Sequence, residues 1–109
     1  MTIAVFGSIN MDITAYSDRL PKPGETLHGD RYLTGLGGKG ANQAAAAARL
    51  GAATDFIGRV GRDHFGNTAL ELLQSLGVDV KHVVNDPDNP TGIAIINVDS
   101  DGENFITVV

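Results

Sequence analysis

The sequence predicts an α/β fold in which a parallel sheet is covered by helices. Residues 2–6 form a continuous apolar run that ends at a glycine, as in strands buried on both faces. Residues 41–50 are rich in alanine and are followed by Gly51, which indicates a helix with a glycine at its carboxyl end. Between Phe65 and Leu76, apolar residues recur at helical spacing and predict a second helix. Helices that alternate with apolar strands are typical of α/β domains.

Two polar residues, Asn10 and Asp12, follow the first predicted strand closely. Open α/β sheets bind their ligands at the carboxyl ends of the strands, so this pair is a candidate binding site. Ordinary turn chemistry is the alternative explanation, because Asn and Asp are both common in turns.

The region before the first helix departs from a simple alternation of strands and helices. Residues 12–18 and 27–34 each predict a short strand, and residues 20–26 predict a loop because they contain two prolines and a glycine. We therefore expect a small flap inserted between the first strand and the first helix.

A glycine-rich segment at residues 35–40 contains a single lysine, Lys39, and leads into the alanine-rich helix. The glycines predict a flexible loop. Asn42 falls in the first helical turn, where the backbone N–H groups are unpaired and the helix dipole is positive. We expect this loop to hold an oxygen-rich or anionic small molecule. The alanines predict a helix that is packed on nearly all sides.

The second half of the chain continues the pattern and then changes to a hairpin. Residues 54–60 and 78–84 predict two further core strands, and Asp63 is placed to cap the second helix. Residues 91–109 predict a β-hairpin, because Asp101-Gly102 is a strong turn dipeptide.

Composition and charge exclude several classes of protein. The net charge is −5 and the eight basic residues are scattered, which argues against nucleic acid and anionic membrane as partners. The chain has no cysteine, so neither disulfides nor thiolate chemistry are expected. No signal peptide is recognised, and no apolar run approaches the ~20 residues of a membrane helix. We expect a cytoplasmic protein.

Motif searches leave one alternative open. Gly35, Gly37 and Gly40 match the G-x-G-x-x-G fingerprint of dinucleotide-binding redox domains, although that fingerprint should follow the first core strand directly. A Walker A motif fails because Lys39 is followed by glycine. Clusters with the spacing of metal ligands are absent, and no metal site is expected in this chain.

Four segments together resemble the ribokinase family of sugar kinases, and they occur in the expected order: Gly7–Asp12, Leu20–Thr26, Gly37–Ala44 and Gly58–Gly66. The resemblance spans essentially the whole chain, and the glycine block is its most specific part. It implies a three-layer αβα core, present in part, with a small β-sheet lid built from segments at about 12–34 and 91–109. Residues 1–109 would then be the N-terminal part of a kinase domain that lacks its ATP-binding part.

The resemblance also implies an activity and a binding site. The activity would be ATP-dependent phosphorylation of D-ribose to D-ribose 5-phosphate, or of a related sugar or nucleoside. Asp12 would accept hydrogen bonds from two neighbouring hydroxyls. The Gly37-Gly38 pair would be the hinge of the lid, and the lid would join two copies into a homodimer. The sugar-binding residues would be Asn10, Met11, Asp12, Gly38, Lys39, Gly40, Ala41 and Asn42.

This sequence lacks several motifs that members of the family contain. The catalytic Asp of the family lies in a Gly-Ala-Gly-Asp-like motif, which this sequence does not contain. The sites for ATP, Mg²⁺ and a monovalent cation such as K⁺ are likewise expected in the missing C-terminal part. We therefore expect no catalytic residue in this chain and no activity from the chain alone. A non-catalytic lid or dimerisation fragment remains a further alternative.

Overall fold

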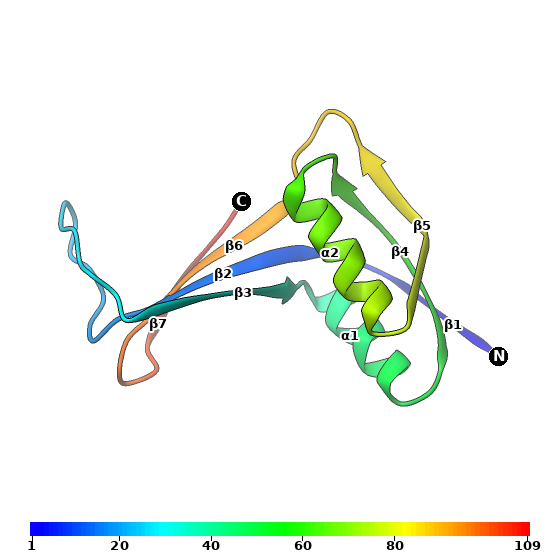
Figure 1. Cartoon of the computed structure of the whole chain (residues 1–109), viewed down its shortest axis with the longest axis horizontal. Coiled ribbons are helices and arrows are strands. Elements are labelled where there is room, and N and C mark those ends of the chain that lie inside the picture. The colour runs from blue at the N-terminus through cyan, green and yellow to red at the C-terminus, as the bar shows by residue number, and fades with distance from the viewer.

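A computed structural model describes the whole chain, residues 1–109, and contains two sheets and two helices (Figure 1). The elements follow one another in the order β1 (Thr2–Phe6), β2 (Asn10–Tyr16), β3 (Arg31–Gly37), α1 (Lys39–Arg49), β4 (Ala53–Gly61), α2 (His64–Ser75), β5 (Val78–Asp86), β6 (Gly92–Val98) and β7 (Asn104–Val108). No helix is both long and apolar enough to cross a membrane.

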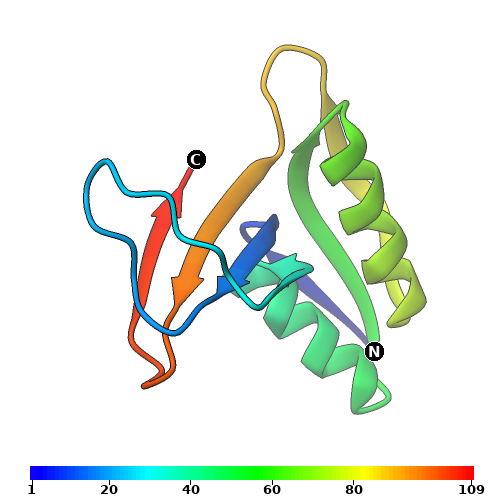
Figure 2. The same ribbon diagram turned by 60° about the vertical axis from the view of Figure 1, so that its left-hand side comes forward.

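The core sheet has the strand order β1-β4-β5, and all of its strands are parallel. The core strands predicted at residues 2–6, 54–60 and 78–84 are therefore confirmed, and the second and third extend further than predicted. Both helices pack on one face of this sheet (Figure 2). Phe56 of the central strand is fully buried in the same core cluster as Ala44 and Leu73. This face contains the hydrophobic core.

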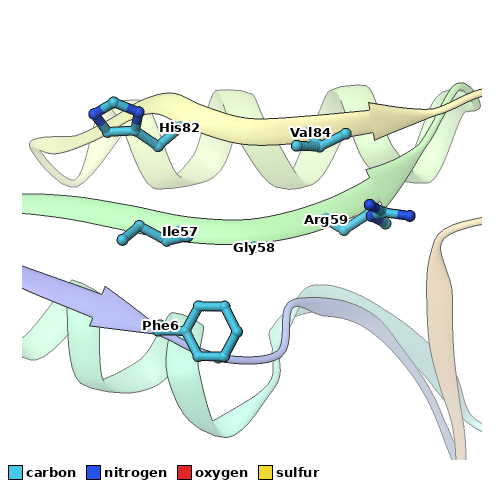
Figure 3. Close-up of a pocket in the computed structure, with 7 residues that line it drawn as sticks. Phe6, Ile57, Gly58, Arg59, His82 and Val84 are labelled. Atoms are coloured by element: carbon cyan, nitrogen blue, oxygen red, sulfur yellow. The ribbon is translucent and has the colours of Figure 1, made fainter.

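The opposite face of the core sheet is open within this chain. Phe6 is 83% exposed there and, with Ile57, Arg59 and Val84, lines a shallow cavity of about 400 Å³ (Figure 3). In Figure 3 these side chains stand on one side of the three strands and the helices lie behind them. Two of the three layers of an αβα core, the sheet and one layer of helices, are thus present.

The second sheet has the strand order β3-β2-β6-β7 and extends away from the core (Figure 1). Strand β2 pairs antiparallel with β3 and parallel with β6, and the predicted hairpin forms β6 and β7. The early flap and the late hairpin therefore belong to one sheet. We call this sheet, β3-β2-β6-β7, the flap sheet. It joins the core at residues 7–9, at Gly38 and at residues 87–91.

The prediction of a glycine loop at residues 35–40 is wrong. Gly35 and Gly37 are the final residues of β3, where they pair with Asp12 and Asn10, and α1 begins at Lys39. Only Gly38 lies between strand and helix. Ladder hydrogen bonds to β2 satisfy the backbone of these glycines, and pairing therefore overrides their preference for turns.

Helix α1 is also less enclosed than predicted. Its buried residues are Gly40, Ala41 and Ala44, whereas Asn42 and Gln43 are exposed. The core sheet covers one side of the helix, and nothing in this chain covers the other. Its predicted end is confirmed, because Gly51 follows the helix with φ +91°.

Candidate functional site

The amino end of α1 rests directly on the link between β1 and β2. The N–H of Ala41 donates to the carbonyl of Ser8 at 3.1 Å. A Cβ atom added to Gly40 would lie 2.8 Å from the Cα of Gly7, so the two segments touch backbone to backbone. This close approach brings the first turn of α1 next to the start of β2.

Asn10 and Asp12 lie on strand β2 itself, not in a turn as the alternative explanation assumed. Because they are two residues apart on a strand, their side chains share one face of the flap sheet. The amide Nδ2 of Asn10 donates to Oδ1 of Asp12 at 2.9 Å. Both residues are partly buried. The sequence-predicted pair is thus brought together and held in one orientation.

Small residues surround the carboxylate of Asp12. Gly35 of β3 and Ala94 of β6 pair with Asp12 on either side, and a Cβ at Gly35 would meet open space. A Cβ at Gly37 would instead collide with the Asp12 carboxylate. Asp12 is partly exposed, and a ligand with hydroxyl groups can therefore approach it from the open side at Gly35. Ala94 escaped the sequence analysis, because its place beside Asp12 depends on the register between β2 and β6.

The first turn of α1 supplies positive charge beside this face. The N-cap residue Gly38 provides no side-chain cap, and the first turn has no acidic residue. The N–H of Ala41 is occupied by Ser8, so the N–H groups of Lys39 and Gly40 are the ones in this turn that can bind oxygen atoms. Lys39 and Asn42 are exposed on this turn, and Lys39 takes part in none of the ion pairs of the structure.

Three of the predicted sugar-binding residues lie in the interior. Met11 is 2% exposed and points away from Asp12 to the core side of the flap sheet. Ala41 is 0% exposed and packs in the core, and Gly40 is buried against Gly7. By packing in the interior, these three residues hold Asp12 and the amino end of α1 in position.

The predicted hinge lies where the flap sheet joins α1. Gly37 is the last residue of β3, and Gly38 has φ +97°, a backbone conformation that L side chains rarely adopt. A Cβ at Gly38 would also lie 2.6 Å from the carbonyl oxygen of Ser8. Glycine is therefore required at this junction both by backbone conformation and by space.

The position of Gly35 and Gly37 does not match the dinucleotide fingerprint. Both lie on β3, an edge strand that pairs antiparallel with β2 in the flap sheet. The fingerprint requires the glycines to follow a strand of the parallel core sheet. The match to G-x-G-x-x-G therefore arises from two glycines at the end of a strand and one at the start of a helix.

A second polar centre anchors the link between β5 and β6. Asp86 is buried and accepts hydrogen bonds from the backbone N–H groups of Asp88 and Asn89 and from the guanidinium of Arg59. The Asp88 N–H and the side chain of Asn89 are the main causes that lower the pKa of Asp86 from 3.8 to about 2. The carboxylate form of Asp86 thus organises this link.

Stability should fall at acid pH partly because of Asp86. A carboxylate whose pKa is lower in the folded than in the unfolded state stabilises the fold above the unfolded value, and this contribution is lost as the pH falls through the folded value. The urea midpoint should therefore be level above about pH 5 and should decline between about pH 4 and pH 2. Asp86→Asn should flatten part of this decline, as followed by circular dichroism.

Glu25 provides the control for that measurement. Its pKa is also lowered to about 2, chiefly by Arg19, but this pair lies on the exposed loop between β2 and β3. Exposed ion pairs contribute little to stability, so Glu25→Gln should change the acid profile less than Asp86→Asn. Equal profiles for the two variants would contradict the role assigned to Asp86.

Comparison with known proteins places this geometry in a family. The sequence matches the family described as "pfkB family carbohydrate kinase" over residues 1–109. A ribokinase of Mus musculus is 42% identical over 107 residues, which cover 98% of this chain and 33% of the relative. A ribokinase of Bacillus subtilis is 46% identical, with 98% of this chain and 36% of the relative covered. The chain thus spans about a third of the length of the curated relatives it matches.

A solved structure supports the same relationship. The ribokinase of Arabidopsis thaliana, complexed with ribose and ATP, superposes with a TM-score of 0.89 at 43% identity, over 98% of this chain and 35% of that one. This likeness confirms the predicted ribokinase-like α/β fold. Since the family match extends over its whole length, this chain belongs to the pfkB family of carbohydrate kinases.

Proposed function

We propose that this chain is the sugar-binding and lid part of a ribokinase, which transfers a phosphoryl group from ATP to D-ribose and yields D-ribose 5-phosphate and ADP. One observation carries the proposal: the Asp12 carboxylate is held by Asn10 on a face lined by small residues, next to the uncapped amino end of α1. The similarity to ribokinases, one of them complexed with ribose and ATP, supports it.

Each polar residue has a defined task in this proposal. Asn10 occupies Oδ1 of Asp12, which leaves the remaining lone pairs of the carboxylate to accept two sugar hydroxyls. Lys39 and Asn42 donate to further sugar oxygens from the first turn of α1. The hydrogen bonds of Asp12 and Lys39 are charge-assisted, and together with that of Asn42 they fix the sugar in one orientation. Orientation matters because phosphoryl transfer is catalysed mainly by positioning and electrostatics.

The remaining catalytic parts are proposed to lie outside these residues. Asp12 binds the sugar, so a different carboxylate must accept the proton of the attacking hydroxyl. The chain has no cluster of three or more His, Cys, Asp or Glu side chains that could hold a metal ion. Because the Gly-Ala-Gly-Asp-like motif is absent from this sequence, the proposal assigns the catalytic base, ATP, Mg²⁺ and a monovalent cation such as K⁺ to a C-terminal part of the protein, and this chain alone would be inactive.

The flap sheet would act as the lid. Its closure about Gly37 and Gly38 would exclude water from the phosphoryl group and so limit ATP hydrolysis. The face that carries Asp12 continues into exposed apolar side chains, Leu33, Ile106 and Val108. Contiguous exposed apolar side chains mark interaction surfaces, which supports a homodimer formed through the lid.

The 109-residue chain should bind D-ribose without phosphorylating it. Isothermal titration calorimetry should detect D-ribose and should show no comparable heat with NADH, the ligand of the dinucleotide alternative. A coupled assay of ADP release with ATP, Mg²⁺ and D-ribose should give no signal. Tight NADH binding would contradict the sugar site, and robust ADP release would contradict the absence of the catalytic base.

A further inference from the structure

A polar contact between Asp63 and Thr91 ties the flap sheet to the core. Oδ1 of Asp63 accepts from the hydroxyl of Thr91 at 2.7 Å, and Oδ2 accepts from the Thr91 backbone N–H at 2.8 Å. Oδ1 also accepts from the N–H of Gly66 at 2.8 Å, where Asp63 caps helix α2. One carboxylate therefore holds the first turn of α2 and the residue that precedes β6. We call this contact the Asp63–Thr91 latch.

The surroundings of Thr91 leave it little freedom to move. Thr91 is 5% exposed, and its hydroxyl accepts from the N–H of Gly61 at 2.9 Å. A Cβ added to Gly61 would lie 2.5 Å from the Thr91 nitrogen and 2.6 Å from the carbonyl oxygen of Asn89. The end of β4, the start of α2 and the start of β6 are thus closely packed.

The latch lies one residue from the strand that adjoins the candidate site. Gly92 follows Thr91 and pairs with Asn10, and Ala94 pairs with Asp12 in the same parallel ladder. Strand β2 has β3 on its other side, and β3 reaches the core through the glycine junction at Gly38. Of the two neighbours that flank Asn10 and Asp12, only β6 is held to the core by a charged side chain.

We infer that Asp63 and Thr91 are positioning residues for the sugar site: by holding β6 on the core, they set where Asn10 and Asp12 lie relative to the first turn of α1. This inference rests on the proposed function for its sugar-binding arm. In the proposed site, neither residue contacts the sugar. The latch fixes the start of β6 on the core, whereas β3 reaches the core through Gly38.

Two substitutions weaken the latch in different ways, and the backbone N–H of residue 91 keeps its contact with Oδ2 of Asp63 in Thr91→Val. Thr91→Val removes the hydroxyl at nearly constant volume, and Thr91→Ser restores it. Asp63→Asn keeps an oxygen for the cap of α2, because Asn caps helices as well as Asp does, but places an amide group opposite Thr91. Thr54→Val is the matched control: Thr54 is 3% exposed and donates to the carbonyl of Ala52 at the far end of β4.

The test uses the whole chain, labelled with ¹⁵N. Thr91→Val and Asp63→Asn should shift the amide resonances of Asn10 and Asp12 and speed hydrogen exchange in β6. They should also weaken D-ribose binding by about fivefold or more, the lower range of coupling between sites. Thr91→Ser should restore both signals, and Thr54→Val should change neither. Unchanged β2 resonances and affinity in the latch variants, or equal changes in the Thr54→Val control, would overturn the inference.

The NMR measurements and the D-ribose binding measurements separate this inference from the proposed function. If the unmodified chain bound no D-ribose, the proposed function would fail, whereas the amide resonances would still decide whether the latch positions β2. If Thr91→Val did not fold, Asp63→Asn and Thr91→Ser would be measured in its place. Normal β2 resonances in Asp63→Asn would then count against the latch.

Discussion

Replacing Asp12 with alanine is expected to weaken D-ribose binding by at least about 100-fold. The carboxylate would accept two sugar hydroxyls, and each hydrogen bond to a charged group contributes ~1.5–3 kcal/mol. The small residues beside it, Gly35 and Ala94, offer no substitute acceptor on their side chains. Isothermal titration calorimetry with D-ribose measures the loss directly.

The Asp12 result needs a control for charge and one for folding. Asp101→Ala removes the same charge at the tip of the hairpin between β6 and β7, and it should leave the affinity for D-ribose unchanged. The fold should survive Asp12→Ala, because the side chain pairs only with Asn10, and circular dichroism can verify this. Equal affinity of Asp12→Ala and the unmodified chain would remove Asp12 from the proposed site.

Replacing Gly40 with alanine is expected to destabilise the fold by about 1–3 kcal/mol, the usual cost of overpacking. The new Cβ would lie 2.8 Å from the Cα of Gly7 and 3.0 Å from the nitrogen of Ser8. Backbone atoms cannot move aside as a flexible side chain can, so the amino end of α1 must shift. That shift would also carry Lys39 and Asn42 away from Asp12 and lower the affinity for D-ribose.

Gly35→Ala is the matched control for stability. Its backbone does not have a positive φ, and its Cβ would meet no atom within 4 Å. Chemical denaturation should therefore give Gly35→Ala a free energy of unfolding close to that of the unmodified chain. If Gly40→Ala were equally stable, the close packing of α1 on the link between β1 and β2 would not limit this region.

Local sequence signals were sufficient for the elements that form the core. The apolar run at residues 2–6 became β1, and Asp63 caps α2 as its position predicted. Gly51 follows the first helix with positive φ. These features could be predicted because strand burial, capping and helix ends depend on neighbours along the chain.

The glycine segment shows where local signals failed. Four glycines among residues 35–40 predict a loop, yet Gly35 and Gly37 are strand residues and only Gly38 joins strand to helix. The partner strand β2 supplies the hydrogen bonds that make this backbone regular. Such pairing is decided by residues distant in sequence, and propensity alone does not reveal it.

The sequence by itself determined the class of fold, the order of its elements and the residues with chemistry to offer, above all Asn10, Asp12 and Lys39. Those properties follow from hydrophobic period, capping and side-chain type. Only the tertiary structure decided which residues meet. The register between β2 and β6 placed Ala94 beside Asp12. The orientation of β2 turned the side chain of Met11 into the core, and close packing of Gly40 on Gly7 placed α1 beside β2. The physical reason is that a site assembled across strands depends on long-range pairing, which no short segment encodes.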